Sequence, residues 1–94
     1  MPSNRTQLKI ITDVLKTARD NQQEEGIGIS TLLRGGNLPY SRLKTLVANL
    51  IQHNLLEEMV HGKGKRYKIS LKGYEFLQTY SRFEEFTRSF GLEL

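Results

Sequence analysis

Five apolar residues between positions 43 and 51 fall on one face of a helix. They stand at i, i+3, i+4, i+7 and i+8: Leu43, Leu46, Val47, Leu50 and Ile51. Because a helix turns once in 3.6 residues, this spacing produces a continuous apolar stripe that other elements have to cover. Pro39 suits the first position of such a helix, and Asn54 suits a left-handed stop after it. The pattern predicts an amphipathic helix over about 39–53.

Upstream, the chain predicts a longer helix, a very short strand and a short helix. Asn4 followed three residues later by Gln7 resembles a capping box, and apolar residues then recur at helical spacing. Ser30 is a suitable N-cap for a second helix, which Gly35 and Gly36 are expected to end. The expected elements are a helix over about 5–21, a one-bridge strand at 27–29 and a helix at 31–34.

Downstream, two short extended runs enclose a basic loop that contains two glycines. The runs cover 55–60 and 66–69, and the loop is His61-Gly62-Lys63-Gly64-Lys65. This arrangement predicts an antiparallel hairpin. Ser70 can then cap a last helix that extends to about residue 89 or 90.

The succession of these elements indicates the fold. A short helix and a longer amphipathic helix joined by a glycine-containing turn form a helix-turn-helix, and the hairpin that follows is a wing. We therefore predict an α+β fold, mostly α: a winged helix-turn-helix with an elongated C-terminal helix. The chain is expected to form one domain over 1–94, with a core over about 5–72 and the C-terminal helix over about 71–90.

Two motifs carry a resemblance to a known family. The first is Asn37-Leu38-Pro39-Tyr40-Ser41-Arg42-Leu43 with Leu50 and Leu55-Leu56 after it, and the second is Tyr67-Lys68-Ile69-Ser70-Leu71-Lys72-Gly73. Over about residues 6–90 the chain resembles small archaeal winged helix-turn-helix DNA-binding proteins, some of them chromatin-associated. The resemblance implies DNA binding and a homodimer formed through the last helix. Pro39 stands where the family usually has a Ser or Thr cap, so we expect a shifted or tilted start of the recognition helix.

The positive charge of the chain is concentrated in its middle. The net charge is +4, yet residues 34–72 hold eight basic residues against Glu57 and Glu58, a balance of +6. Such a local surplus is typical of a site for a polyanion, although a solvated basic surface would give the same count. Within a winged helix-turn-helix, it predicts double-stranded DNA as the partner.

Candidate DNA contacts come from the outward arc of helix 39–53 and from the wing at 61–66. A helix fits the major groove, where Arg bonds guanine bidentately and Asn or Gln pairs with adenine. From the helix we expect base and phosphate contacts by Tyr40, Ser41, Arg42, Lys44, Thr45, Asn49 and Gln52. From a flexible wing loop we expect sequence-independent phosphate contacts by Lys63, Lys65 and Arg66.

The last helix repeats an aromatic residue every seven positions. The repeat consists of Phe76, Phe83 and Phe90, and Thr79 and Phe86 occupy a second position of the same seven-residue repeat. These five residues form the seam of the helix, and Leu77 and Tyr80 lie beside it, nearer the body. Exposed aromatic stripes generally mark an interface, which predicts an antiparallel, coiled-coil-like dimer. The alternative is that this helix folds back on the first helix and buries the rings within one chain.

The remaining features favour a binding protein over an enzyme. The chain has no cysteine, no histidine pair at ligand spacing and no phosphate-binding loop, so we expect no catalysis, no metal and no cofactor. We also expect no small-molecule effector and no membrane association. The expected role is that of a transcriptional regulator or chromatin protein in the cytoplasm, associated with the nucleoid. The alternative is a winged-helix module that binds another protein.

Overall fold

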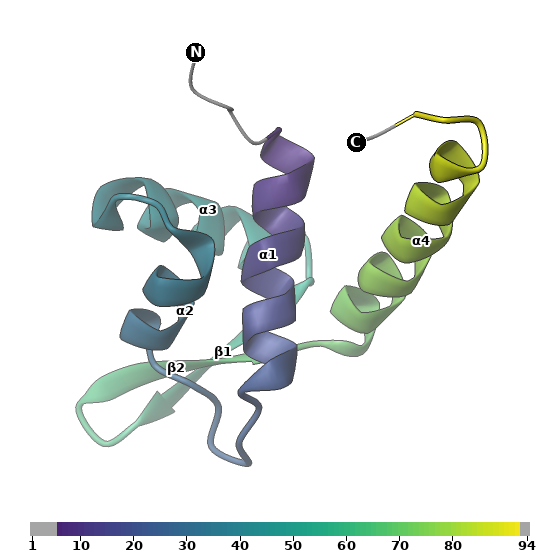
Figure 1. Cartoon of the computed structure of the whole chain (residues 1–94). Coiled ribbons are helices and arrows are strands. Elements are labelled where there is room, and N and C mark those ends of the chain that lie inside the picture. Colours follow the sequence, from purple (N-terminus) through teal and green to yellow (C-terminus); the bar gives the residue numbers. More distant parts are fainter. Residues whose placement is uncertain (1–5, 93–94) are drawn as a thin grey trace.

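The computed structural model describes residues 6–92 as four helices and a two-stranded sheet (Figure 1). The elements are α1 (Gln7–Asp20), α2 (Ile29–Gly36), α3 (Tyr40–Gln52), β1 (Leu56–His61), β2 (Gly64–Ile69) and α4 (Leu71–Arg88). Their order and type confirm the prediction from the sequence. The fold is a mostly helical α+β winged helix with a C-terminal helix.

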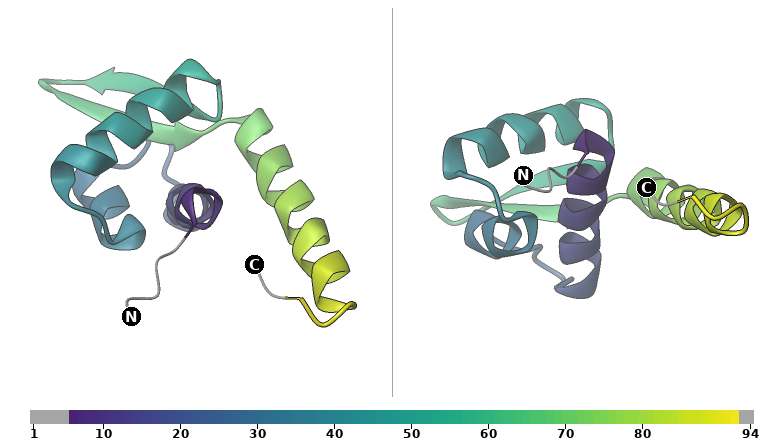
Figure 2. Two further views of the ribbon diagram at one scale, coloured as in Figure 1. Left: turned by 90° about the horizontal axis from the view of Figure 1, so that it is seen from above. Right: turned by 45° about the horizontal axis from the view of Figure 1, so that its top comes forward.

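The core lies between α1, α2, α3 and the base of the hairpin. Seen from above in Figure 2, α1 stands end-on, α3 lies lengthwise with the hairpin behind it, and α4 leads away from the group. The stripe predicted on α3 is buried at Leu43, Leu46, Val47 and Leu50, and partly buried at Ile51. The side chains packed around it include Val14, Leu15, Leu32, Leu56 and Ile69. Because these side chains cover the stripe, α3 is oriented with its polar arc outward.

Two helix starts differ by one or two residues from the prediction. Helix α1 begins after Thr6, whose Oγ1 accepts a hydrogen bond from the Lys9 amide at 3.1 Å. The predicted cap, Asn4, lies outside the described residues. Pro39 is the N-cap of α3 and not its first residue, because its extended backbone leaves the helix to begin at Tyr40.

Helix α2 differs most from the prediction. It has Gly28, not Ser30, at its N-cap, and it runs through the glycine pair instead of ending there. The reason is a close helix contact, since a Cβ on Gly35 would lie 1.8 Å from Thr17 Oγ1 of α1. The glycine permits the two helices to approach, and Asn37, with φ +53°, provides the left-handed stop.

The hairpin is tighter than predicted. β1 and β2 pair antiparallel over their full length, so only Gly62 and Lys63 remain for the turn. Gly62 has φ +62°, which fits a type II′ turn, whose first central position favours glycine. Lys65 and Arg66 therefore stand inside β2 and not in a flexible loop.

The predicted strand at 27–29 is present as a single bridge. Ile27 pairs with Tyr67 on the other edge of β2 through two backbone hydrogen bonds of 2.8 Å. This bridge ties the loop that follows α1 to the middle of the hairpin.

Helix α4 begins at a formed cap and then leaves the body. Ser70 Oγ accepts from the Gly73 amide at 3.0 Å and donates to the Asn54 carbonyl at 2.6 Å, which confirms the predicted cap. Leu77 and Tyr80 are buried against the body, as expected. The later turns extend away from it (Figures 1 and 2).

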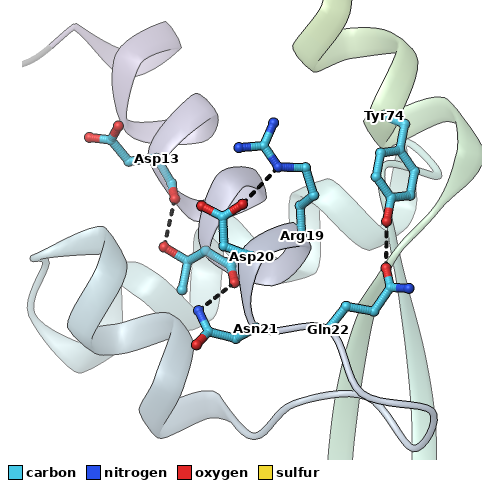
Figure 3. A network of polar contacts seen from close by, with 7 residues as sticks. Asp13, Arg19, Asp20, Asn21, Gln22 and Tyr74 are labelled. Atoms are coloured by element: carbon cyan, nitrogen blue, oxygen red, sulfur yellow. Dashed lines mark hydrogen bonds and ion pairs between the residues drawn. The ribbon is translucent and has the colours of Figure 1, made fainter.

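Polar contacts fix the end of α1 against the first turns of α4 (Figure 3). The Tyr74 hydroxyl of α4 donates to Gln22 Oε1 at 2.5 Å. At the C-cap of α1, Asn21 Nδ2 donates to the Thr17 carbonyl at 2.9 Å. The loop that leaves α1 is thus held on one side by α4 and on the other by β2.

Candidate nucleic-acid interface

The arc of α3 opposite the core is uncovered. All of the side chains predicted to contact DNA from this helix are exposed: Tyr40, Ser41, Arg42, Lys44, Thr45, Asn49 and Gln52. The centre of the arc, directly opposite the buried leucines, carries Ser41, Thr45 and Gln52. No other element among residues 6–92 covers this centre, so a polar and basic helix face is open to a partner.

Arg42 and Asn49 occupy one flank of α3, toward the start of α1. They lie along a hollow of about 330 Å³, whose walls are Gln7, Ile10, Leu38, Ser41, Arg42, Thr45, Leu46 and Asn49. Gln7 was not predicted as a site residue, because only the tertiary fold brings the first turn of α1 to this flank. Two of the three side chains predicted to read bases therefore line the edge of the exposed arc and share it with α1.

The other flank of α3 faces the hairpin. Lys44 Nζ lies 5.5 Å from the centroid of the Tyr40 ring, within reach of a cation–π contact. Burial raises the pKa of the Tyr67 hydroxyl above its usual 10, and the nearby Glu58 carboxylate and Tyr40 raise it further. Tyr40 of α3 is thus near enough to Tyr67 of β2 to affect its ionisation.

The two faces of the hairpin have different neighbours, because successive side chains along a strand point to opposite sides. The register defines an α3 face, which consists of Glu58, Val60, Lys65 and Tyr67. On this face Lys65 Nζ lies 3.7 Å from Glu58 Oε2, with the lysine side chain 64% exposed. Lys63, at the turn, is also exposed. Two of the three predicted wing contacts thus stand next to α3 or at the tip.

The opposite side, the loop face, consists of Glu57, Met59, His61, Arg66 and Lys68. It faces the loop at residues 22–26. The contacts are Arg66 Nη2 to the Gly26 carbonyl at 2.8 Å, Lys68 Nζ to the Glu24 carbonyl at 3.4 Å and His61 Nε2 to Glu25 Oε2 at 3.2 Å. The expectation that Arg66 projects from the wing loop is therefore wrong, because β2 turns it away from Lys65. Its contact with DNA stays a prediction.

The aromatic seam of α4 is largely uncovered. Phe83, Phe86 and Phe90 are 48%, 61% and 66% exposed, Thr79 is exposed and Phe76 is half-buried. Phe86 and Phe90 meet edge to face with their ring centroids 5.0 Å apart. The alternative in which one chain buries these rings against α1 is not the observed arrangement. The antiparallel dimer predicted on this seam stays a prediction.

An apolar hollow of about 190 Å³ lies between the start of α1 and the seam. Its walls are Leu8, Phe76, Thr79, Tyr80 and Phe83. Leu8 is itself 39% exposed, so the apolar surface extends from α4 onto α1. The hollow is of a size that an aromatic side chain can enter.

The arrangement agrees with a family of known proteins. The model of a family described as winged helix-turn-helix matches residues 4–88. The chain belongs to this family. No curated protein matches its sequence.

Solved structures similar to this winged helix-turn-helix protein include archaeal ones. Sso10a-2, a DNA-binding protein from Sulfolobus solfataricus, has a TM-score of 0.76 at 20% identity, covering 92% of this chain and 85% of its own. AF1382 from Archaeoglobus fulgidus has a TM-score of 0.68 at 14% identity, covering 86% of this chain and 89% of its own. A mutant of MepR from S. aureus has a TM-score of 0.73 at 17% identity, covering 92% of this chain and 64% of its own. These matches confirm the resemblance in fold stated from the two motifs.

Other site types find little support in the described part of the chain. Residues 6–92 contain no group of three His, Asp or Glu side chains arranged to hold a metal ion. No helix within the same range is long and apolar enough to cross a membrane. The exposed arc of α3, the α3 face of the hairpin and the seam of α4 remain the candidate surfaces for a partner.

Proposed function

We propose that this protein binds double-stranded DNA, with α3 in the major groove and the hairpin against the phosphate backbone. One observation carries the proposal: the polar, basic arc of α3 is uncovered, and Lys63 and Lys65 of the wing are exposed as well. A helix and a neighbouring hairpin of this size match the width of a major groove and the strand beside it. The fold of Sso10a-2, itself a DNA-binding protein, supports the proposal.

Within this site, the helix and the wing have different roles. Arg42 suits guanine, and Asn49 or Gln52 suits adenine, so these side chains are assigned to base edges. Tyr40, Ser41, Lys44 and Thr45 are assigned to phosphates or a thymine methyl group. Lys63 and Lys65 contribute affinity for any sequence by displacing counterions from the backbone. Arg66 would join them only by leaving its contact with the Gly26 carbonyl.

We further propose that two copies pair through the seam of α4, as an antiparallel homodimer. The exposed phenylalanines and the apolar hollow beside Leu8 give each copy a surface that its own chain leaves open. An α4 of 18 residues spans about 27 Å, whereas successive major grooves on one side of a duplex lie roughly 34–36 Å apart. In such a dimer, the overlap of the two α4 helices would set the distance between the two α3 helices.

The test is a duplex titration at two salt concentrations, with random and selected sequences side by side. Replacing Lys63 and Lys65 by Ala should weaken binding to every duplex to a similar extent. The slope of log K against log salt should become shallower by about 0.9 for each phosphate that the wing no longer neutralises. The matched control is the double substitution Lys68→Ala with Lys72→Ala, which removes the same charge away from the α3 face.

Equal slopes for the two double variants would refute the wing contact. Arg42→Ala and Asn49→Ala should alter sequence preference more than affinity for random DNA, if α3 reads base edges. A protein that binds no duplex even at low salt would instead favour the protein-binding alternative.

A further inference from the structure

One acidic side chain stands within the surface proposed to face DNA. Glu58 belongs to the α3 face of the hairpin, whereas its neighbour Glu57 belongs to the loop face. These are the two acidic residues of the basic segment 34–72. Only Glu58 is thus placed where bound phosphates would pass.

Two neighbours define the geometry around Glu58, namely Tyr67 and Lys65. Glu58 is the register partner of Tyr67, and Lys65 is the register partner of Val60, so the two charges are diagonal neighbours on one face. Lys65 Nζ lies 3.7 Å from Glu58 Oε2. The side chain of Glu58 is 35% exposed, compared with 64% for Lys65. The carboxylate is therefore the more enclosed partner, and the ammonium is the more exposed one.

Glu58 lies beside the buried Tyr67 on the core side of the wing. Tyr67, beside it, is buried and carries electrostatic influence from both Glu58 and Tyr40 of α3. Lys44 stands over the Tyr40 ring on the same flank of α3. A phosphate that approaches Lys65 from this side has to take the place of the Glu58 carboxylate beside the ammonium group.

We propose that Glu58 restrains non-specific DNA binding by holding Lys65 in an ion pair that a phosphate has to replace. This inference rests on the proposed DNA binding and concerns the regulation of that site. The cost of breaking the pair is the same for every sequence, so it lowers the affinity for arbitrary duplex. Contacts of α3 with bases then make a larger relative contribution to complex formation.

The test compares Glu58→Gln with Glu57→Gln. Both substitutions remove one negative charge from adjacent positions, and they differ only in the face of the hairpin that changes. Glu58→Gln should tighten binding to a random duplex by roughly threefold to tenfold, because Lys65 becomes free to bind a phosphate. It should also steepen the salt slope by about 0.9, the value for one more neutralised phosphate. Glu57→Gln should leave the slope unchanged.

A second background shows whether the effect passes through Lys65. In Lys65→Ala, the further change Glu58→Gln should produce neither the gain in affinity nor the steeper slope. Circular dichroism melting of each variant verifies that the fold is retained.

Two results would overturn the inference while leaving the proposed function intact. One is an equal effect of Glu58→Gln and Glu57→Gln on affinity and slope. The other is a gain from Glu58→Gln that persists without Lys65. If neither the wild type nor Glu58→Gln binds any duplex, the proposed function and this inference both fail.

Discussion

Replacing Phe83 by Ala is expected to dissociate the proposed dimer. Phe83 stands in the middle of the seam, lines the hollow beside Leu8 and is 48% exposed. With about 200 Å² for an exposed phenylalanine side chain, roughly 100 Å² of this ring remains to be buried on each protomer. At about 25 cal/mol/Å², burial of both copies contributes about 5 kcal/mol to association.

Alanine retains the Cβ, so the expected reduction in association free energy is smaller, about 3–4 kcal/mol. This corresponds to an increase of about 10²- to 10³-fold in the dissociation constant of the dimer. Sedimentation velocity over a range of protein concentrations measures this directly. The matched control is Leu71→Ala, because Leu71 is 77% exposed on the same helix but lies off the seam. An equal effect of the two substitutions, or a wild type that is monomeric at high micromolar concentration, would refute the interface.

Two further predictions concern the body of the domain. Gly35→Ala should lower the free energy of unfolding by about 1–3 kcal/mol, because its Cβ would lie 1.8 Å from Thr17 Oγ1. The control is Gly64→Ala, whose Cβ would meet only the His61 carbonyl at 3.9 Å, and it should hardly change the melting temperature. Equal shifts in the melting temperature of the two variants would contradict the close packing of α1 and α2. Because the pKa of Tyr67 is raised in the folded chain, its hydroxyl stays neutral there at a pH at which the same hydroxyl ionises in the unfolded chain. The contribution of this hydroxyl to stability is therefore intact below about pH 10 and disappears above it. Tyr67→Phe should therefore reduce the fall in melting temperature between about pH 9 and pH 11, and an unchanged fall would show that the pKa of Tyr67 does not differ between the two states.

The fold is predictable from the sequence because its strongest signals are periodic. The stripe from Leu43 to Ile51 specifies one buried face whatever the surrounding sequence, and covering it requires the other helices and the hairpin. The cap at Ser70 and the bridge at Ile27 are also local enough to be recognised. These features together define the element order.

The glycine pair at the end of α2 departs from its sequence-based interpretation for a physical reason. A glycine ends a helix where the backbone needs a positive φ, but it also permits two helices to approach closely. Gly35 serves the second purpose, and its partner, Thr17, belongs to a different helix. No local pattern distinguishes these two uses.

The candidate site is predictable in its residue types and less so in its geometry. The alternation of side chains along a strand already implies that Lys65 and Arg66 point to opposite faces. Which of these faces meets α3 depends on the strand edge that Ile27 pairs with and on the contacts of the loop at 22–26, and the partners in both cases are far apart in the sequence. The same holds for Gln7, which reaches the flank of α3 only through the fold.

The two-residue turn at Gly62 and Lys63 is a suitable place to attach a label for measuring distances within the proposed dimer. A side chain at this tip is exposed, and the chain contains no cysteine. Lys63→Cys would therefore introduce a unique thiol for attachment of a fluorophore or spin label at the far end of a short, rigid ribbon. Distances between two such labels would report the separation of the wings within a dimer, free and on DNA.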